Sequence, residues 1–297
     1  MTLGRDSAAP SVDGGPSARP SGGTRSYSLA YLTSCTLTPP QAVRLAAELG
    51  YAHVGLRLLP NAAGAPQQHL IARPEVLRET VAAQRDTGVG VFDLEIIRIA
   101  EGFDPQRYLP LLEAGAALQA KAALVAGDDT DETRLTEGYA RLCELMRPYG
   151  MTADLEFMPW TAVPNAKAAL RVIRAAGNPV NAGILVDALH FDRSDTTLDD
   201  IRAIPRELLH YAQICDAPTR AQVGRAFTVE EMIHTARCER LLPGEGGIDL
   251  RGLFGALPHD LPVSVEVVHL QRMAVLGQTE WAQQCLACSR DLLEPGR

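Results

Sequence analysis

From residue 27 onward, short apolar runs alternate with longer segments that are apolar on one face only. Short continuous apolar runs are typical of parallel strands that are covered on both sides by helices. The runs predict eight strands, at residues 27–34, 53–59, 91–99, 122–127, 153–158, 183–187, 209–215 and 262–268.

The segments between the runs carry the start and stop signals of helices. In 38–50, Thr38 is a suitable N-cap, prolines occupy the first turn and Gly50 ends the pattern. Similar patterns predict helices at 73–87, 105–118, 131–149, 164–176 and 276–292. The stretch 218–248 is the least regular, and we expect a short helix (228–237) and a loop there.

Eight strands alternating with helices predict an α/β fold, a single (β/α)8 TIM barrel at residues 27–297. A doubly wound open sheet is the structural alternative. The glycine fingerprint usual after the first strand of such sheets is missing, because 33-TSCTLTPP-40 contains no glycine. The barrel is therefore the favoured fold.

Residues 1–26 are rich in Gly, Pro, Ser and Ala and predict a flexible, disordered tail, since they have little to bury. The tail contains no apolar run resembling the core of a secretion signal. No stretch approaches the ~20 apolar residues that span a bilayer. We therefore expect a cytoplasmic protein without a membrane partner.

Charge and cysteine content narrow the function. The net charge of −8 argues against a nucleic-acid partner, because nucleic-acid binders usually carry a basic surface. Of the six cysteines, only Cys285 and Cys288 form a CxxC, and no second pair has zinc-finger spacing. We expect reduced, mostly buried cysteines.

Four polar residues lie near the C-terminal ends of the last four predicted strands: Glu156, Asp187, Gln213 and Glu266. Consecutive strands are neighbours in a barrel wall, and functional residues gather at their C-terminal ends. Three carboxylates in one pocket repel one another unless a cation or protons compensate. An all-oxygen set suits Mg²⁺ or Mn²⁺. Each residue alone is also explained as a polar strand end in solvent, but four in succession favour a shared metal.

Several nearby residues are candidates for substrate contact, each with a plainer explanation. His190 could transfer a proton or could pack against a helix end. Arg57 and Glu95 could reach the pocket or could pair with each other. Trp160 could wall the substrate or could belong to the core.

Two features after the seventh predicted strand could each bind a substrate anion or could each be an ordinary part of a loop. Arg220, in 213-QICDAPTR-220, could hold a substrate anion or could be a solvated loop residue. The glycines of 243-PGEGGIDL-250 could cradle an anion, although a tight loop is the commoner explanation.

At these residues the chain resembles the xylose-isomerase-like TIM-barrel superfamily of sugar phosphate isomerases and epimerases, over residues 27–290. The resemblance rests on LEF with Glu156, VDxxH with Asp187 and His190, QICDAP with Gln213, PGEG, and SVEV with Glu266.

The resemblance implies that Glu156 and Glu266 bind the metal and also move protons beside the substrate carbonyl. Asp187 and Gln213 would be further ligands. Many sugar epimerases and isomerases of this group have His where this chain has Gln213. Glutamine followed by DAP resembles the 3-dehydroshikimate dehydratase branch.

The implied reaction is proton abstraction next to a carbonyl, through an enediolate. With one divalent metal, Mn²⁺ or Mg²⁺ before Co²⁺ or Zn²⁺, the sequence favours an isomerase or epimerase acting on a sugar-like polyhydroxy-ketone. A dehydratase (lyase) of a cyclic ketone, such as 3-dehydroshikimate or inosose, is the alternative.

Two other readings carry less weight. A related barrel family repairs abasic DNA, but the negative charge and the seven histidines do not fit such an enzyme. A non-catalytic sugar-binding barrel would hold no metal. Barrels of this type often pair, so a homo-oligomer is one expectation.

Overall fold

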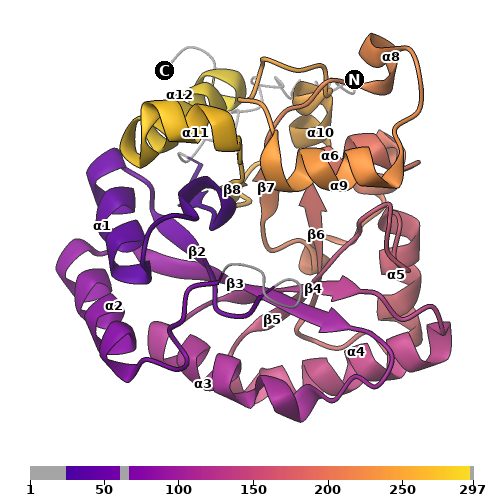
Figure 1. Ribbon diagram of the computed structural model, residues 1–297. Coiled ribbons are helices and arrows are strands. Elements are labelled where there is room, and N and C mark those ends of the chain that lie inside the picture. Colours follow the sequence, from indigo (N-terminus) through magenta and orange to yellow (C-terminus); the bar gives the residue numbers. More distant parts are fainter. Residues whose placement is uncertain (1–24, 61–66, 295–297) are drawn as a thin grey trace, which may run out of the picture.

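Eight parallel strands close into a barrel, in the order β1 to β8, with helices around the outside (Figure 1). The computed structural model describes residues 25–60 and 67–294. The predicted (β/α)8 barrel is confirmed. The strands are β1 (Tyr27–Leu29), β2 (His53–Arg57), β3 (Gly90–Ile99), β4 (Ala122–Gly127), β5 (Thr152–Glu156), β6 (Ala182–Asp187), β7 (Ala212–Ile214) and β8 (Val263–Val265).

The larger helices follow the strands around the barrel. They are α1 (Pro39–Leu49), α2 (Pro74–Thr87), α3 (Leu109–Leu118), α4 (Glu132–Met146), α5 (Ala166–Ala175), α9 (Val229–Cys238) and α12 (Gln278–Leu293). The short ones are α6 (Ala188–Arg193), α7 (Leu198–Arg202), α8 (Arg220–Val223), α10 (Leu250–Ala256) and α11 (Leu270–Leu276). Four 3-10 turns complete the set: η1 (Leu32–Ser34), η2 (Pro105–Tyr108), η3 (Arg147–Tyr149) and η4 (Arg206–Leu208).

The structure differs from the prediction at the ends of elements and in its short helices. The first predicted strand stops at Leu29, because the chain leaves the sheet and forms η1. The short helices α6, α7, α8, α10 and α11 were not predicted. The predicted tail, residues 1–26, falls almost wholly outside the described residues, which begin at Arg25.

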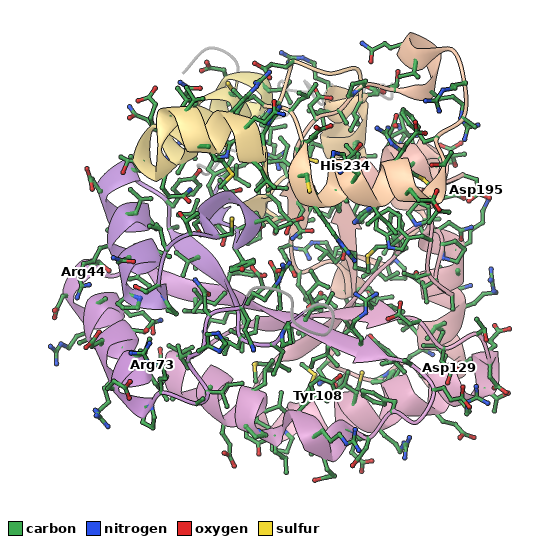
Figure 2. All side chains as sticks on the ribbon, in the orientation of Figure 1. Arg44, Arg73, Tyr108, Asp129, Asp195 and His234 are labelled. Atoms are coloured by element: carbon green, nitrogen blue, oxygen red, sulfur yellow. The ribbon has the colours of Figure 1, made fainter. Side chains whose placement is uncertain are left out.

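Charged side chains lie on the outer faces of the helices, as Arg44 of α1 and Arg73 before α2 show (Figure 2). Within the described residues, no helix is both long and apolar enough to cross a membrane. All six cysteines are free, including Cys285 and Cys288 of α12.

The barrel interior contains an apolar cluster and a buried carboxyl group. The small apolar cluster, from β4, β6 and their neighbours, includes Leu124, Leu185 and Tyr211. Asp93 of β3 is fully buried and accepts no hydrogen bond within the described residues. Burial and the charges of nearby carboxylates raise its pKa well above the ordinary value. The neutral form of Asp93 is therefore favoured relative to an aspartic acid in water.

Asp154 of β5, which is buried, pairs with the partly buried His210, which precedes β7. His210 Nδ1 lies 2.7 Å from Asp154 Oδ1. Burial opposes the charge on His210, but its hydrogen bond with Asp154 and the carboxylate charge together raise its pKa. Gly183 of β6 passes this pair so closely that an added Cβ would overlap atoms of both side chains.

Gly183→Ala is therefore expected to destabilise the protein by about 1–3 kcal/mol, the usual cost of overpacking a buried site. The matched control is Gly255→Ala in α10, where an added Cβ meets nothing within 4 Å. That change should stabilise by about 0.5–1 kcal/mol, because alanine favours a helix over glycine. Urea unfolding midpoints measure both. Equal shifts in the two variants would contradict this account of Gly183.

Candidate active site

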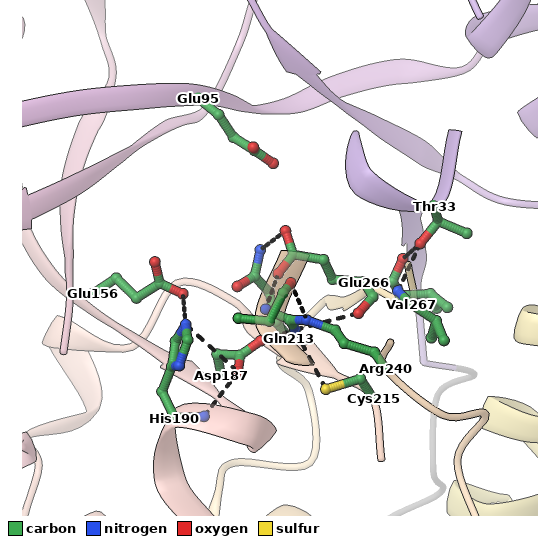
Figure 3. Close-up of polar contacts among 12 residues, drawn as sticks. Thr33, Glu95, Glu156, Asp187, His190, Gln213, Cys215, Arg240, Glu266 and Val267 are labelled. Carbon is green, nitrogen blue, oxygen red and sulfur yellow. Dashed lines mark hydrogen bonds and ion pairs between the residues drawn. The ribbon is translucent and has the colours of Figure 1, made fainter. Parts of the chain in front are cut away.

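The barrel brings the four predicted metal ligands together at its C-terminal end (Figure 3). Glu156 and Asp187 are the last residues of β5 and β6, Gln213 lies in β7, and Glu266 directly follows β8. Asp187 and Gln213 are register partners in adjacent strands. All four side chains are buried.

Thr33 of η1 fixes the backbone around Glu266. Its hydroxyl donates to the carbonyl oxygen of Val265 at 2.7 Å and accepts from the backbone N–H of Val267 at 2.8 Å. The backbone on both sides of Glu266 is thereby tied to the turn after β1.

The sequence did not predict Arg240, whose side chain lies between two of the four ligands (Figure 3). Its Nη1 is 2.6 Å from Asp187 Oδ2, and its Nη2 is 3.0 Å from Glu266 Oε2. The residue is 2% exposed. No motif marks it, because it lies in the irregular stretch after α9 and reaches the site only through the fold.

The two glutamates hold protons more tightly than glutamates in water. Burial raises the pKa of Glu156 well above the ordinary value, and the charges of Asp187 and Glu266 add to this. Burial also raises the pKa of Glu266, to about 8, although Arg240 opposes the shift. Raised carboxyl pKa values near neutrality suit general acid–base catalysis.

Asp187 behaves differently, because it contacts positive and donor groups directly. Burial raises its pKa, but Arg240 and His190 outweigh this effect and leave the pKa below the ordinary value. Its Oδ1 also accepts the backbone N–H of His190 at 3.0 Å, which caps α6. Asp187 is therefore the permanently charged member of the set.

His190 lies beside Glu156, with Nε2 3.5 Å from Glu156 Oε1. Burial lowers the pKa of His190 to about 4, so the ring is neutral at pH 7. Trp160 packs edge-on against this ring, with centroids 5.0 Å apart. Trp160 thus both walls the pocket and orients His190.

Arg57 and Glu95 pair with each other, as one of the two sequence interpretations expected. Arg57 Nη2 is 2.6 Å from Glu95 Oε2, and the two residues are register partners on β2 and β3. The Arg57 guanidinium also lies 4.4 Å from the ring centroid of Tyr31. Glu95 Oε1 is buried without a partner within the described residues, and both side chains line the pocket.

The pocket at this end of the barrel is a cavity of about 50 Å³. Its lining consists of Leu32, Arg57, Glu95, Ile96, Arg98, Leu124, Glu156, Met158, Trp160, His190, Ala236, Arg237, Arg240 and Glu266. Such a volume holds a few water molecules, whereas small-molecule sites usually measure about 300–1,000 Å³. Side chains must therefore move to admit a substrate.

A larger cavity, of about 550 Å³, lies between the segment after β3 and α4, around Phe103 and Arg134. We place the candidate active site in the smaller one, because its lining includes Glu156 and Glu266, strand-end carboxyl groups with raised pKa values.

Arg220 is not brought into the pocket. It is exposed at the first position of α8 and is not among the lining residues. Its substrate contact stays a prediction.

The glycine-rich turn at 243–250 is filled by the chain's own Asp216. The Asp216 carboxylate accepts backbone N–H groups from Ala217, Gly244 and Ile248, at 2.8–3.1 Å. The turn is a tight loop, as the commoner explanation held, and the anion it cradles is part of the protein.

The four predicted ligands carry oxygen atoms of the kind that bind divalent cations. In this structure, however, several of these oxygen atoms already accept hydrogen bonds from protein groups. Gln213 donates to Glu266 Oε1 at 3.1 Å, while its own Oε1 is buried without a partner within the described residues. Arg240 holds one oxygen each of Asp187 and Glu266. No cluster of three or more His, Cys, Asp or Glu side chains in residues 25–60 and 67–294 is arranged to hold a metal. In the present arrangement, the contacts of Arg240 and Gln213 occupy carboxylate oxygens that a cation would need.

Comparison with known families agrees with this site. Residues 43–291 match the xylose isomerase-like TIM-barrel family. The chain belongs to this family. Members include isomerases, epimerases and dehydratases.

Individual relatives are more distant. The chain is 28% identical over 160 residues to a 3-dehydroshikimate dehydratase of Pseudomonas aeruginosa. The matched region covers 52% of this chain and 24% of the relative. The match thus spans about a quarter of that protein's own length.

Two solved structures share the fold. An IolI protein with a bound zinc atom superposes with a TM-score of 0.73 at 17% identity, covering 90% of this chain and 98% of that one. A D-allulose 3-epimerase from Methylomonas sp., in complex with D-allulose, gives 0.63 at 14% identity, covering 90% and 97%.

Proposed function

We propose that this protein is a dehydratase that removes water from a cyclic hydroxy-ketone carrying a carboxylate. The reaction starts with proton abstraction next to the carbonyl. The sequence ranks an isomerase or epimerase first, whereas the charge distribution of the pocket supports the dehydratase.

The observation that carries the proposal is Arg237 at the pocket mouth. Arg237 is exposed, lines the cavity and has no acidic partner within the described residues. Burial lowers its pKa, as do the positive charges of Arg98 and Arg57. A guanidinium among other guanidinium groups is well suited to a carboxylate or phosphate, which it binds through two parallel hydrogen bonds. A neutral ketose would leave this charge uncompensated.

The similarity to a 3-dehydroshikimate dehydratase supports the same direction. That name describes an anionic cyclic ketone, the substrate class that Arg237 suits. The QICDAP segment with Gln213 belongs to the same resemblance. Because the match covers only 24% of that relative, the proposal takes from it a substrate class and not one particular substrate.

Glu156, Asp187, Gln213 and Glu266 would hold the divalent metal, which supplies positive charge to the carbonyl oxygen as negative charge develops there. Glu266 lines the cavity and is assigned the role of the base. It takes the proton beside the carbonyl. Glu156, which lines the cavity beside His190, is assigned the role of the acid.

The elimination balances in two steps. The electron pair of the broken C–H bond first forms an enolate and then the new C=C bond, as the bond to the β-hydroxyl breaks. The hydroxyl leaves as water with the proton from Glu156. His190, neutral and 3.5 Å from Glu156, orients that carboxyl group, and Trp160 shields it from solvent.

An isomerase or epimerase is the second candidate, because Glu156 and Glu266 both line the cavity. Either glutamate could therefore return a proton to carbon in place of releasing water. The first half of the reaction is the same.

The test is mass spectrometry of a substrate panel incubated with Mn²⁺-loaded enzyme in D₂O. The panel holds ketoses, their phosphates, 2-keto-inositol and 3-dehydroshikimate. We expect loss of one water from the carboxylated cyclic ketone. Deuterium uptake without loss of water would establish an isomerase or epimerase, and no change in any compound would reject both.

Glu156→Gln and Glu266→Gln should each lower turnover by about 10²–10⁴-fold, the usual contribution of a positioned acid or base. The fold should persist, because glutamine has nearly the same shape. Circular dichroism and thermal unfolding check the fold, and kcat on the accepted substrate checks the chemistry. Near-normal kcat in either variant would remove that glutamate from the mechanism.

Arg237→Gln should raise KM for the anionic substrate by about tenfold, since one charge-assisted contact is worth about 1.5–3 kcal/mol before solvent weakens it. Arg220→Gln is the matched control: it removes an exposed arginine that does not line the cavity. Steady-state kinetics of both variants decide the question. A larger effect at Arg220 would place the anion there, as the sequence analysis suggested.

A further inference from the structure

The Arg240 guanidinium contacts polar groups of four other residues. Besides its ion pairs with Asp187 and Glu266, its Nη1 lies 3.3 Å from Cys215 Sγ and 3.3 Å from the Glu266 carbonyl oxygen. Its Nε donates to the carbonyl oxygen of Ala236 at 3.0 Å. The guanidinium therefore acts as the cation of the acidic cluster.

The backbone of Arg240 is fixed, so only its side chain is free to leave. The Arg240 N–H donates to the carbonyl oxygen of Val268 at 2.7 Å. The residues on either side form bridges with the ends of β8 and β7, Glu239 with His269 and Leu241 with Asp216. The pocket lies directly beside the guanidinium, since Arg240 is one of its lining residues.

Arg240 contacts Asp187 Oδ2 and Glu266 Oε2, so a divalent cation that binds these two oxygens would compete with the guanidinium for them. We infer that Arg240 is a built-in competitor of the metal, and that metal entry moves its side chain off Asp187 and Glu266 into the pocket. The inference rests on the proposed function only in assigning the same four side chains to a metal.

Competition has two consequences for this chain. Before metal enters, Arg240 compensates the charges of two buried carboxylates, which would otherwise be left unpaired at a high cost. After metal enters, the displaced guanidinium adds a positive charge to a pocket already lined by Arg57, Arg98 and Arg237. Metal loading and affinity for an anionic ligand should therefore rise together.

The experiment is equilibrium dialysis with Mn²⁺ alone, with bound metal counted by elemental mass spectrometry. Arg240→Gln should bind Mn²⁺ at least about tenfold more tightly than the wild type, because a full charge no longer competes. Arg240→Lys keeps the charge and should gain less. Arg98→Gln is the matched control, because Arg98 lines the same cavity but pairs with Asp128, outside the ligand set. It should change the affinity by less than about threefold, since it alters only the general potential.

An equal increase in Mn²⁺ affinity in Arg240→Gln and Arg98→Gln would mean that loss of any nearby positive charge strengthens metal binding. That result would overturn the inference. Weaker or unchanged binding in Arg240→Gln would do the same, as would a failure of every variant to bind Mn²⁺. If Arg240→Gln does not unfold cooperatively, the wild type supplies a second measurement. The Nε–Hε signal of Arg240, assigned by its absence in Arg240→Lys, should shift when Mg²⁺ is added.

A fixed Arg240 signal at saturating Mg²⁺ would also overturn the inference. Turnover of the substrate panel is measured separately. Turnover without competition would defeat this inference alone, whereas competition without turnover of any panel compound would defeat the proposed function alone.

Discussion

The structure of the active end depends on how buried negative charge is balanced. Three carboxylates, Glu156, Asp187 and Glu266, meet in one buried region, where Coulomb repulsion is poorly screened. Arg240 compensates two of them directly. Burial raises the pKa of both glutamates, and the charges of neighbouring carboxylates raise these pKa values further. Groups with such pKa values are the kind that the proposed proton transfers require.

Charge balance also explains the layout of the pocket. Arg57 pairs with Glu95 across β2 and β3, on the other side of the cavity from β6. Each inner arginine is thus held by an acid, and the mouth arginine, Arg237, is the one without an acidic partner in the part of the chain that the structure describes. A substrate anion would complete the same arrangement.

The fold, and the gathering of the four polar strand-end residues at one end of the barrel, could be predicted because their signals are local. Each strand is a short apolar run, and Glu156 or Asp187 directly ends such a run, so a barrel brings them together. The Arg57–Glu95 pair could be foreseen as one of two outcomes, because both residues lie on adjacent strands. The short helices α6 and α10 have too few residues for a clear period.

Arg240 could not be found in this way. It lies 53 residues after Asp187 and 26 before Glu266, in a stretch without a repeating pattern. Its place in the site follows from the backbone bridges of Glu239 and Leu241, which join this stretch to the segments that follow the paired strands β8 and β7. The sequence shows the charge but not the path that brings it into the barrel.

The arginines that line the pocket and the acidic residues of the site come from different parts of the fold, because Arg237 and Arg240 lie in the long connection between β7 and β8. The acids sit on or next to the strands, where a change would disturb the barrel, whereas Arg237 and Arg240 come from one excursion fastened at both ends. Substitutions within α9 can therefore alter what enters the pocket without moving the proton-transferring groups. During evolution, substitutions in this connection could therefore change which substrate binds, while the acidic residues at the strand ends stayed the same.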